Sequence, residues 1–281
     1  MLNAKEVVTS RQNPTVKLVC SLLDKKARRA ERAFRFDGIK LFSEAVACRI
    51  AIVCVIMSDK ADKKITDAVD SAVASGAIHA DAVTTVSEQL FERISEECSP
   101  EGIITVAEWI EDIHASYGSL DNYSVAPNEK LLVAEALRDP GNLGTVIRSC
   151  AALGIDRLIV SDDCADIYNP KTIRAAMGGL FRLRIDRVAT ELLPDAVGLL
   201  RQSGRRVFAA ALRKDALRVG EIEMAGGDCF VIGNEGHGLS DAVIDACDAC
   251  AIIPMTENSE SLNAAAAAAI CIWETVKAKR L

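Results

Sequence analysis

After residue 129 the chain alternates short apolar runs with segments of helix length, and this alternation constrains the fold more than any other feature. Runs that are apolar almost throughout are typical of strands buried on both faces of a parallel sheet. The runs are Leu131–Ala136, Arg157–Val160, Leu183–Val188, Val207–Leu212, Cys229–Ile232 and Ala251–Pro254. We therefore predict an α/β fold with a parallel sheet covered on both faces, and we expect ligands in the loops that follow the strands.

The first part of the chain shows the same alternation less regularly. Apolar runs at Ala51–Met57 and Gly102–Ala107 flank a helical stretch at Asp62–Ala74, which predicts a small α/β domain. Between the two parts, residues 116–128 read SYGSLDNYSVAPN, without periodicity and rich in Ser, Asn, Gly and Pro. We therefore expect an N-terminal domain over 1–115, a linker over 116–128 and a second domain over 129–281.

Composition indicates whether the protein is soluble or membrane-bound. Half of the 281 residues are apolar and the net charge is −7. The longest apolar run, Ala264–Trp273, falls short of the roughly 20 residues that a bilayer span needs, and no early segment resembles an export signal. We expect a soluble cytoplasmic protein with no membrane partner.

The ten cysteines have no regular spacing, which indicates reduced thiols packed as small apolar groups. The pair Cys247 and Cys250 forms one CxxC, but there is no second pair at zinc-site spacing, and the three histidines lie far from it in sequence. We expect no metal site.

Positive charge is concentrated near the start. The first 40 residues hold ten of the 33 Lys and Arg but four of the 40 Asp and Glu. Six of these bases lie within eleven residues: Lys25, Lys26, Arg28, Arg29, Arg32 and Arg35. The run fits two interpretations, a solvated helix face or a patch that faces RNA phosphates, with Lys25, Lys26, Arg28, Arg29 and Arg32 as the RNA-binding residues.

Three loops after the predicted strands carry unusual residues. The first leads into residues 136–154, ALRDPGNLGTVIRSCAALG. Here we expect Asn142 to cap a helix, and Gly144 and Arg148, four apart, to share one face. Helical side chains lean toward the N-terminus, so Arg148 is expected to point to the helix start, an arrangement that suits an anion.

The second loop reads GNEGHGLS at 233–240, and its three glycines predict a tight turn that can offer backbone groups to a ligand. It does not match the dinucleotide fingerprint GxGxxG. The third loop begins at Ile253 and ends in Ser261-Leu262-Asn263, followed by six alanines. The alanines favour a helix and also permit very close packing.

Taken in order, NxGxxxR at 142–148, GNEGxGLS at 233–240 and IPMxxxxESLNxxxA at 253–267 resemble the three signature motifs of the SpoU/TrmH family of RNA 2′-O-ribose methyltransferases. In the first half, SRQNPTVK, FRFDGIKLFSEA and SPEGIITVAE resemble the N-terminal substrate-binding domain of that family. IYNPKTIRAAMGGLFRLRI at 167–185 also matches, so the resemblance covers nearly the whole chain.

The resemblance implies a SPOUT-class catalytic domain with a C-terminal trefoil knot, S-adenosylmethionine as cofactor, RNA as substrate and a homodimer with its active site at the subunit interface. It places the cofactor mainly on backbone groups near Gly233, Asn234, Gly236, Ile253, Met255 and Leu262. It implies that Arg148 contacts the target ribose and its phosphate. It also implies that four further polar residues hold Arg148 and the loops in place, namely Asn142, Glu235, Ser261 and Asn263. Because guanidinium scarcely deprotonates near neutrality, we expect Arg148 to position and stabilise rather than to act as a base.

Two departures and two alternatives accompany this interpretation. Glu257 stands where members of the family often carry Gly, and Asp37 stands where Glu is more typical. A non-catalytic RNA-binding or ribosome-assembly protein could retain the same fold. Within the enzyme interpretation, ribosomal RNA is favoured over tRNA, because tRNA-specific relatives commonly lack the N-terminal domain.

Overall fold

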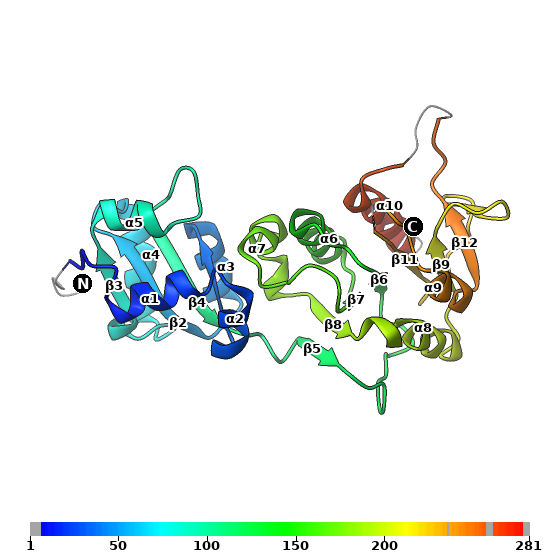
Figure 1. Cartoon of the computed structure of the whole chain (residues 1–281), viewed down its shortest axis with the longest axis horizontal. Helices are drawn as coiled ribbons and strands as arrows, with labels where there is room; N and C mark the ends of the chain where they lie inside the picture. Colours follow the sequence, from blue (N-terminus) through cyan, green and yellow to red (C-terminus); the bar gives the residue numbers. More distant parts are fainter. Residues whose placement is uncertain (1–6, 235, 257–260, 278–281) are drawn as a thin grey trace. The chain divides into compact units, whose positions relative to one another are not determined.

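The structure, a computed structural model, describes residues 7–234, 236–256 and 261–277. The chain folds into two compact units (Figure 1). The first comprises Met1–Ile110 with Tyr168–Arg174, and the second comprises Glu111–Ile167 with Ala175–Leu281. We describe each unit by itself.

The first unit has a four-stranded sheet in the order β1-β4-β2-β3. Its strands are β1 (Ala33–Asp37), β2 (Ile52–Ser58), β3 (Val83–Val86) and β4 (Ile103–Glu108). β4 runs antiparallel to both of its neighbours, and β3 runs parallel to β2. The carboxyl ends of β1, β2 and β3 therefore share one edge of this sheet.

Helices cover both faces of that sheet. They are α1 (Pro14–Ser21), α2 (Lys25–Glu31), α3 (Ile39–Ala47), α4 (Lys63–Ala74) and α5 (Glu88–Ile94), with a 3₁₀ turn, η1, at Ala80–Ala82. Alternate residues of β2 explain its apolar run: Cys54 and Ile56 pack in the core beneath α1 and α5, whereas Val55 and Met57 pack beneath α3 and α4. A strand buried on both faces has no polar side to show in its sequence.

The second unit has an eight-stranded sheet in the order β10-β12-β9-β11-β6-β7-β8-β5, and every neighbouring pair is parallel. Its strands are β5 (His114–Tyr117), β6 (Leu131–Ala134), β7 (Arg157–Ser161), β8 (Arg184–Val188), β9 (Val207–Ala210), β10 (Leu217–Arg218), β11 (Cys229–Ile232) and β12 (Ala249–Ile252). All six predicted runs form strands, which confirms the parallel α/β fold. The two strands that the sequence did not predict, β5 and β10, are edge strands of four and two residues.

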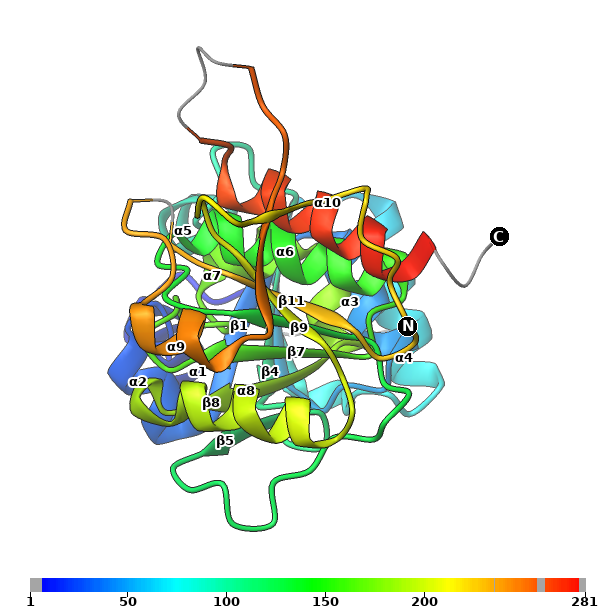
Figure 2. The same cartoon turned by 90° about the vertical axis from the view of Figure 1, so that its right-hand side faces the viewer.

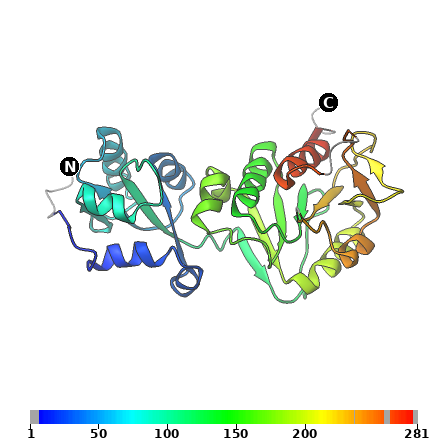
Figure 3. The ribbon, with the colours of Figure 1, turned by 45° about the horizontal axis from the view of Figure 1, so that its top comes forward.

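Helices also cover both faces of the second sheet, as Figure 2 and Figure 3 show: α6 and α10 lie on one side, and α8 and α9 on the other. The helical elements are α6 (Pro140–Leu153), α7 (Pro170–Ala176), α8 (Leu193–Gln202), α9 (Asp241–Ala246) and α10 (Ala264–Lys277), with 3₁₀ turns η2 (Gly179–Phe181) and η3 (Thr190–Leu192). α7 begins in the first unit and ends in the second. The trefoil knot remains a prediction, because residues 257–260 on the path into α10 lie outside the described residues.

The expected linker at 116–128 lies within the second unit. Its first residues belong to β5, which pairs with β8, and Tyr123 is buried in the core. Buried arginines hold the rest: the Arg157 guanidinium donates to the Ser124 carbonyl at 3.3 Å, and Arg205 donates to the Ala126 carbonyl. The division between the units therefore falls near residue 110, before the segment that the composition singled out.

The described residues include no helix that is both long and apolar enough to span a bilayer. They also include no group of three His, Cys, Asp or Glu side chains arranged to hold a metal ion. The ten cysteines are free thiols, and most are buried. Burial raises the pKa of Cys247 to about 12, so this thiol is protonated at neutral pH.

Candidate active site

The candidate site begins where β6 and β11 lie side by side. Ala134 pairs with Ile232, and the N–H of Glu135, one residue beyond β6, donates to the Ile232 carbonyl at 2.9 Å. β6 and β11 are neighbours in the sheet; the next strand on the far side of β6 is β7, and the next on the far side of β11 is β9. Such a switch point leaves a crevice outside the carboxyl ends of the strands. The first two sequence motifs follow these two adjacent strands.

Asp139 caps α6, whereas we expected Asn142 to do so. The Asp139 Oδ1 accepts from the Asn142 backbone N–H at 2.8 Å, and Pro140 occupies the first turn, where its missing N–H costs nothing. Because Asn142 lies inside the helix, its side chain can serve elsewhere. Its Oδ1 accepts from Asn263 Nδ2 at 3.0 Å, which joins the first motif to the third across 121 residues.

Asn263 fixes the start of α10 as well as the contact with α6. Its Oδ1 accepts from the backbone N–H groups of Ala265 at 3.0 Å and Ala266 at 3.3 Å. α10 packs on α6 and β11, and it buries Ala264, Ala265 and Ala268. The alanine run thus permits close packing within the chain, in addition to its high helix propensity.

The second motif closes into a tight loop around Asn234. The backbone N–H and C=O of Asn234 bond the C=O and N–H of Gly238 at 3.1 and 2.9 Å. The Asn234 side chain accepts from the Gly236 N–H at 2.8 Å and donates to the Ala136 carbonyl at 2.9 Å. A Cβ on Gly233 would lie 2.5 Å from the Gly238 carbonyl carbon, so only glycine fits there. Glu235 lies outside the described residues.

Glu135 is a site residue that the sequence reasoning did not single out. Its buried carboxylate accepts from the Ser240 N–H at 2.8 Å and from the Ser240 Oγ–H at 2.7 Å, and Ser240 caps α9. The contact holds the far end of the second motif against β6. Its only sequence signal is an acidic residue inside the apolar run Leu131–Ala136.

A cavity of about 180 Å³ lies next to the third motif and near the end of β9. It is lined by Ala210, Ala211, Leu212, Ala251, Ile252, Ile253, Met255, Ser261, Leu262 and Ala267. Four of these were expected, namely Ile253, Met255, Ser261 and Leu262. The residues after β9 were missed, although the small side chains of Ala210 and Ala211 are a weak signal of close approach. Glu257 lies outside the described residues.

Arg148 is exposed on α6, two turns beyond the Asp139 cap. Its side chain makes no hydrogen bond or ion pair with the part of the chain that the structure describes. Behind it, Gly179 of η2 lies so close that a Cβ there would sit 3.3 Å from the Arg148 Cα. The glycine pair at 178–179 therefore supports the backbone under Arg148, while the guanidinium is available for a ligand.

The fold leaves some bases of the basic run in the first unit exposed and buries others. Lys25, Lys26, Arg29 and Arg32 are exposed, as the RNA-binding interpretation requires. Arg28, which we also assigned to RNA, is buried; its guanidinium donates to the Leu22 and Leu23 carbonyls, both at 2.8 Å. That assignment is wrong for Arg28, because three-carbon stems let guanidinium groups reach interior carbonyls.

Arg35, the last base of the run, is also interior. It pairs with Asp37 at 2.7 Å and donates to the Ile94 carbonyl at 2.9 Å. The second carboxylate oxygen of Asp37 accepts from Ser95 Oγ at 2.8 Å. Asp37, which we noted as a departure from the more typical Glu, thus joins β1 to the loop after α5.

Comparison with known proteins follows the same division of the chain. The profile of the SpoU rRNA Methylase family matches residues 129–273, and that of the MRM3-like substrate binding domain matches residues 13–105. Among curated proteins, the chain is 29% identical over 266 residues to the 23S rRNA (guanosine(2553)-2′-O)-methyltransferase RlmP of Bacillus subtilis, covering 95% of this chain and 97% of that one.

Two solved structures resemble nearly the whole chain. The AdoMet-bound rRNA methyltransferase from Sinorhizobium meliloti superposes with a TM-score of 0.80 at 28% identity, covering 97% of each chain. The SpoU methyltransferase AviRb from Streptomyces viridochromogenes, in complex with the cofactor AdoMet, superposes with a TM-score of 0.78 at 26% identity, covering 95% of this chain and 99% of that one.

Proposed function

The chain belongs to the SpoU rRNA methylase family, and from that premise we propose that it transfers the methyl group of S-adenosylmethionine to a ribose 2′-hydroxyl of ribosomal RNA. The observation that carries the proposal is the junction of the three motifs. The Asn142–Asn263 hydrogen bond at 3.0 Å joins the first motif to the third, and the Asn234–Ala136 bond at 2.9 Å joins the second to the first. Arg148 lies on α6, the helix that carries Asn142, and the apolar cavity is lined by Ser261 and Leu262, which directly precede Asn263.

The cavity next to the third motif fits the cofactor. Its lining is apolar except for Ser261, and its alanines, Ala210, Ala211, Ala251 and Ala267, have small side chains that let a ligand approach the backbone closely. A flat purine ring suits such a wall, and backbone N–H and C=O groups can read its edge. When bound, the cofactor supplies a methyl group made electrophilic by its sulfonium sulfur. The described lining holds no charged side chain to compete with that positive charge.

Arg148 acts on the RNA side of the reaction. A guanidinium donates in a planar fork that matches phosphate oxygens, and it stays protonated. Arg148 would hold the phosphate beside the target ribose and orient the 2′-hydroxyl, so that its contribution is positioning and electrostatic stabilisation. Asn142 and Asn263 support this role by fixing α6 against the start of α10.

Ribosomal RNA is the proposed substrate in preference to tRNA. The names of RlmP, of the Sinorhizobium meliloti structure and of the family whose profile matches the second unit all specify rRNA, and the profile of the first unit is that of a substrate-binding domain. A cytoplasmic location follows from this substrate. A non-catalytic RNA-binding protein is the competing function, and an exposed Arg148 in the first motif together with an apolar cavity at the third motif favours catalysis.

The second unit would form a homodimer through the outer face of α10. Ala266, Ile270 and Trp273 follow one another at helical spacing on that face, and Ile270 and Trp273 remain 36% and 48% exposed. A second copy of the chain covers this stripe in the proposed dimer, with the C-terminal segment threaded as a knot in each subunit. Light scattering at micromolar concentration tests it: Trp273→Glu shifts the wild-type dimer to monomers, and a monomeric wild type refutes it.

Transfer of labelled methyl groups to ribosomal RNA from a strain that lacks the gene tests the reaction itself. Nuclease digestion and mass spectrometry then locate the label. We expect it on ribose, whereas label on bases alone, or none despite cofactor binding, contradicts the proposal. Cofactor binding measured by calorimetry separates an inactive enzyme from a misfolded one.

Arg148→Ala tests the mechanism. Single-turnover transfer at saturating cofactor is expected to fall by about 10² to 10⁴, the range for loss of a positioned catalytic group. Arg148→Lys recovers only part, because an ammonium cannot form the planar fork. Arg218→Ala is the matched control, since Arg218 is also exposed in the second unit and, among the described residues, its side chain pairs with Glu221 alone, at the surface. Equal rates for Arg148→Ala and Arg218→Ala refute the role of Arg148.

A further inference from the structure

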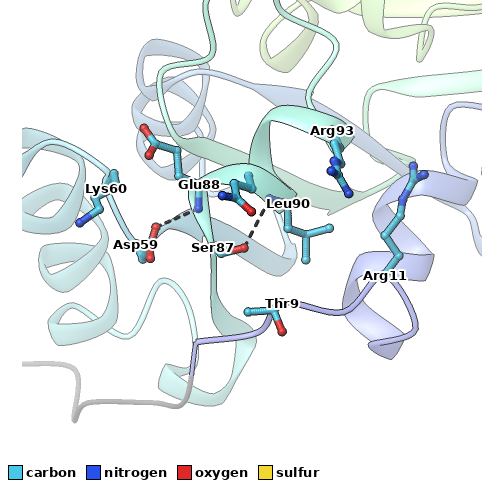
Figure 4. Close-up of a pocket in the computed structure, with 9 residues that line it drawn as sticks. Thr9, Arg11, Asp59, Lys60, Ser87, Glu88, Leu90 and Arg93 are labelled. Carbon is cyan, nitrogen blue, oxygen red and sulfur yellow. Dashed lines mark hydrogen bonds between the residues drawn. The ribbon is translucent and has the colours of Figure 1, made fainter.

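The first unit contains a polar cavity of about 520 Å³ that the SpoU motifs do not involve (Figure 4). It opens at the sheet edge where β2 and β3 end, beside the N-terminal segment. It is lined by Thr9, Arg11, Asp59, Lys60, Ser87, Glu88, Gln89, Leu90 and Arg93. Its wall is polar, in contrast to the apolar cavity of the second unit.

Backbone hydrogen bonds give this cavity a fixed wall. Val8 bridges Val86 like a further parallel strand, with the Val8 N–H donating to the Thr85 carbonyl at 2.9 Å and the Ser87 N–H donating to the Val8 carbonyl at 3.0 Å. On the other side, the Asp59 N–H donates to the Val86 carbonyl at 2.8 Å. The residues that follow these anchors, including Thr9, are therefore held in position before any ligand arrives.

Three cations face the cavity. Arg11, Lys60 and Arg93 are exposed, and none makes an ion pair with the residues that the structure describes. Figure 4 draws Arg11 and Arg93 on one side of the cavity and Lys60 on the other. Of the two carboxylates in the lining, that of Asp59 is engaged by the Glu88 N–H at 2.9 Å. Separated, unpaired cations suit an extended chain of negative charges.

The remaining lining residues indicate what kind of anion fits. Thr9, Ser87 and Gln89 supply hydroxyl and amide groups, and none of the nine lining residues is aromatic. Recognition of unpaired bases and nucleotides commonly uses aromatic stacking, whereas phosphate and ribose contacts need only donors and cations. The lining therefore suits a sugar–phosphate backbone rather than a base.

We propose that this cavity binds the phosphodiester backbone of the RNA substrate, through Arg11 and Arg93 on one side and Lys60 on the other. The proposal rests on the proposed function, because it presumes an RNA substrate. It moves the predicted RNA contact beyond the exposed face of α2 to the ends of β2 and β3. Contacts of this kind fix the position of the RNA without reading its sequence.

The test compares Arg11→Ala/Arg93→Ala with Lys63→Ala/Lys64→Ala, which removes the same charge from exposed positions of α4 outside the cavity lining. The probe is a fluorescein-labelled RNA hairpin of random sequence, and its affinity is measured by anisotropy between 50 and 300 mM KCl. We expect the cavity variant to bind about tenfold more weakly and to lose between one and two units of the log–log salt slope. The control variant keeps most of its RNA affinity and most of its salt slope.

Two further measurements separate the possible failures. Calorimetry with S-adenosylmethionine reports on the second unit: unchanged cofactor affinity in the cavity variant shows that this unit is folded and leaves the proposed function untouched. Equal affinity and slope in the cavity variant and the control overturn the inference. A second result also overturns the inference: AMP or inorganic phosphate binds with micromolar affinity, and Arg11→Ala/Arg93→Ala abolishes that binding but retains RNA binding. The cavity would then bind a small anion.

Discussion

Gly233→Ala probes the second motif most directly, because the added methyl group meets backbone and not a flexible side chain. The Cβ would lie 2.5 Å from the Gly238 carbonyl carbon, 2.6 Å from the Gly238 oxygen and 2.6 Å from the Leu239 nitrogen. Ordinary contacts begin near 3.4 Å, so the two ends of the loop must separate by about 1 Å. The loop cannot make that space by rotating a side chain.

The cost has two parts. Forcing a methyl group into a close-packed site costs about 1 to 3 kcal/mol. Separating Gly233 from Gly238 also strains the two Asn234–Gly238 backbone hydrogen bonds, at 3.1 and 2.9 Å, each of which contributes about 1 kcal/mol. A total of about 2 to 5 kcal/mol lowers the melting temperature of the second unit by roughly 5 to 15 °C. Cofactor affinity falls as well, because the loop positions Asn234 on the Ala136 carbonyl.

Two neighbouring glycines provide matched controls. At Gly236 the nearest atom to an added Cβ is Asn234 Oδ1 at 3.4 Å, and the backbone is not left-handed, so Gly236→Ala changes stability by less than about 0.5 kcal/mol. At Gly238 nothing lies within 4 Å, but φ is +68°, so Gly238→Ala costs about 1 kcal/mol of backbone strain. The expected order of destabilisation is therefore Gly236, then Gly238, then Gly233.

Urea and thermal unfolding of the three variants, with calorimetry for S-adenosylmethionine, test this order. Distinct transitions for the two units are assigned by the cofactor, which raises only that of the second unit. A melting temperature for Gly233→Ala within about 1 °C of that for Gly236→Ala refutes the reasoning, since the contact at 2.5 Å would then have been relieved without cost.

Three further predictions concern charge. Replacing the exposed Lys25, Lys26 and Arg29 with alanine should flatten the salt dependence of RNA binding by up to about three units at unchanged cofactor affinity, and an unchanged slope in the anisotropy assay would make α2 only a solvated face. Burial lowers the pKa of His114 from 6.5 to about 4, so between these pH values the unfolded chain binds a proton that the folded chain does not. The free energy of unfolding therefore falls as pH decreases from about 6.5 to 4, by on the order of 3 kcal/mol. In urea unfolding His114→Gln should lose less stability across that window, and an equal loss in the variant and the wild type would contradict this. Glu135→Ala leaves two donors of the α9 cap, the Ser240 N–H and Oγ–H, without their carboxylate and should destabilise the second unit by about 2 to 4 kcal/mol. Glu135→Gln keeps one acceptor and should lose less stability. Equal melting temperatures for the two variants would mean that the carboxylate contact contributes little.

The order of buried strands could be anticipated only in part, although their positions were clear. Each strand of a doubly covered parallel sheet is apolar on both faces, so runs such as Leu131–Ala136 stand out locally. Which strands are neighbours depends on how the whole chain winds. That β6 and β11 are adjacent, nearly 100 residues apart, brings the first two motifs together, and no local pattern specifies it.

Caps and buried charges show the same limit at the level of single residues. Pro140 at the first helical position locally marks Asp139 as the cap, whereas the partner of the Asn142 side chain, Asn263, lies 121 residues away and was set by the tertiary structure. The fate of a basic run was equally undetermined. Arg35 is interior because the Ile94 carbonyl, 59 residues away, lies within reach of its guanidinium.

The sequence by itself determined the elements whose signals are local: the apolar strands, the helix starts, and the glycine, asparagine and arginine motifs in the loops after the strands. Only the tertiary structure decided which polar groups meet, including Glu135 with Ser240 across 105 residues and the cations Arg11 and Arg93 beside the end of β3. The physical reason is that backbone conformation and the period of the apolar pattern depend on residues that are near neighbours in the chain. A hydrogen bond or a cavity needs groups from remote segments at a fixed distance, and only the packed fold supplies that distance.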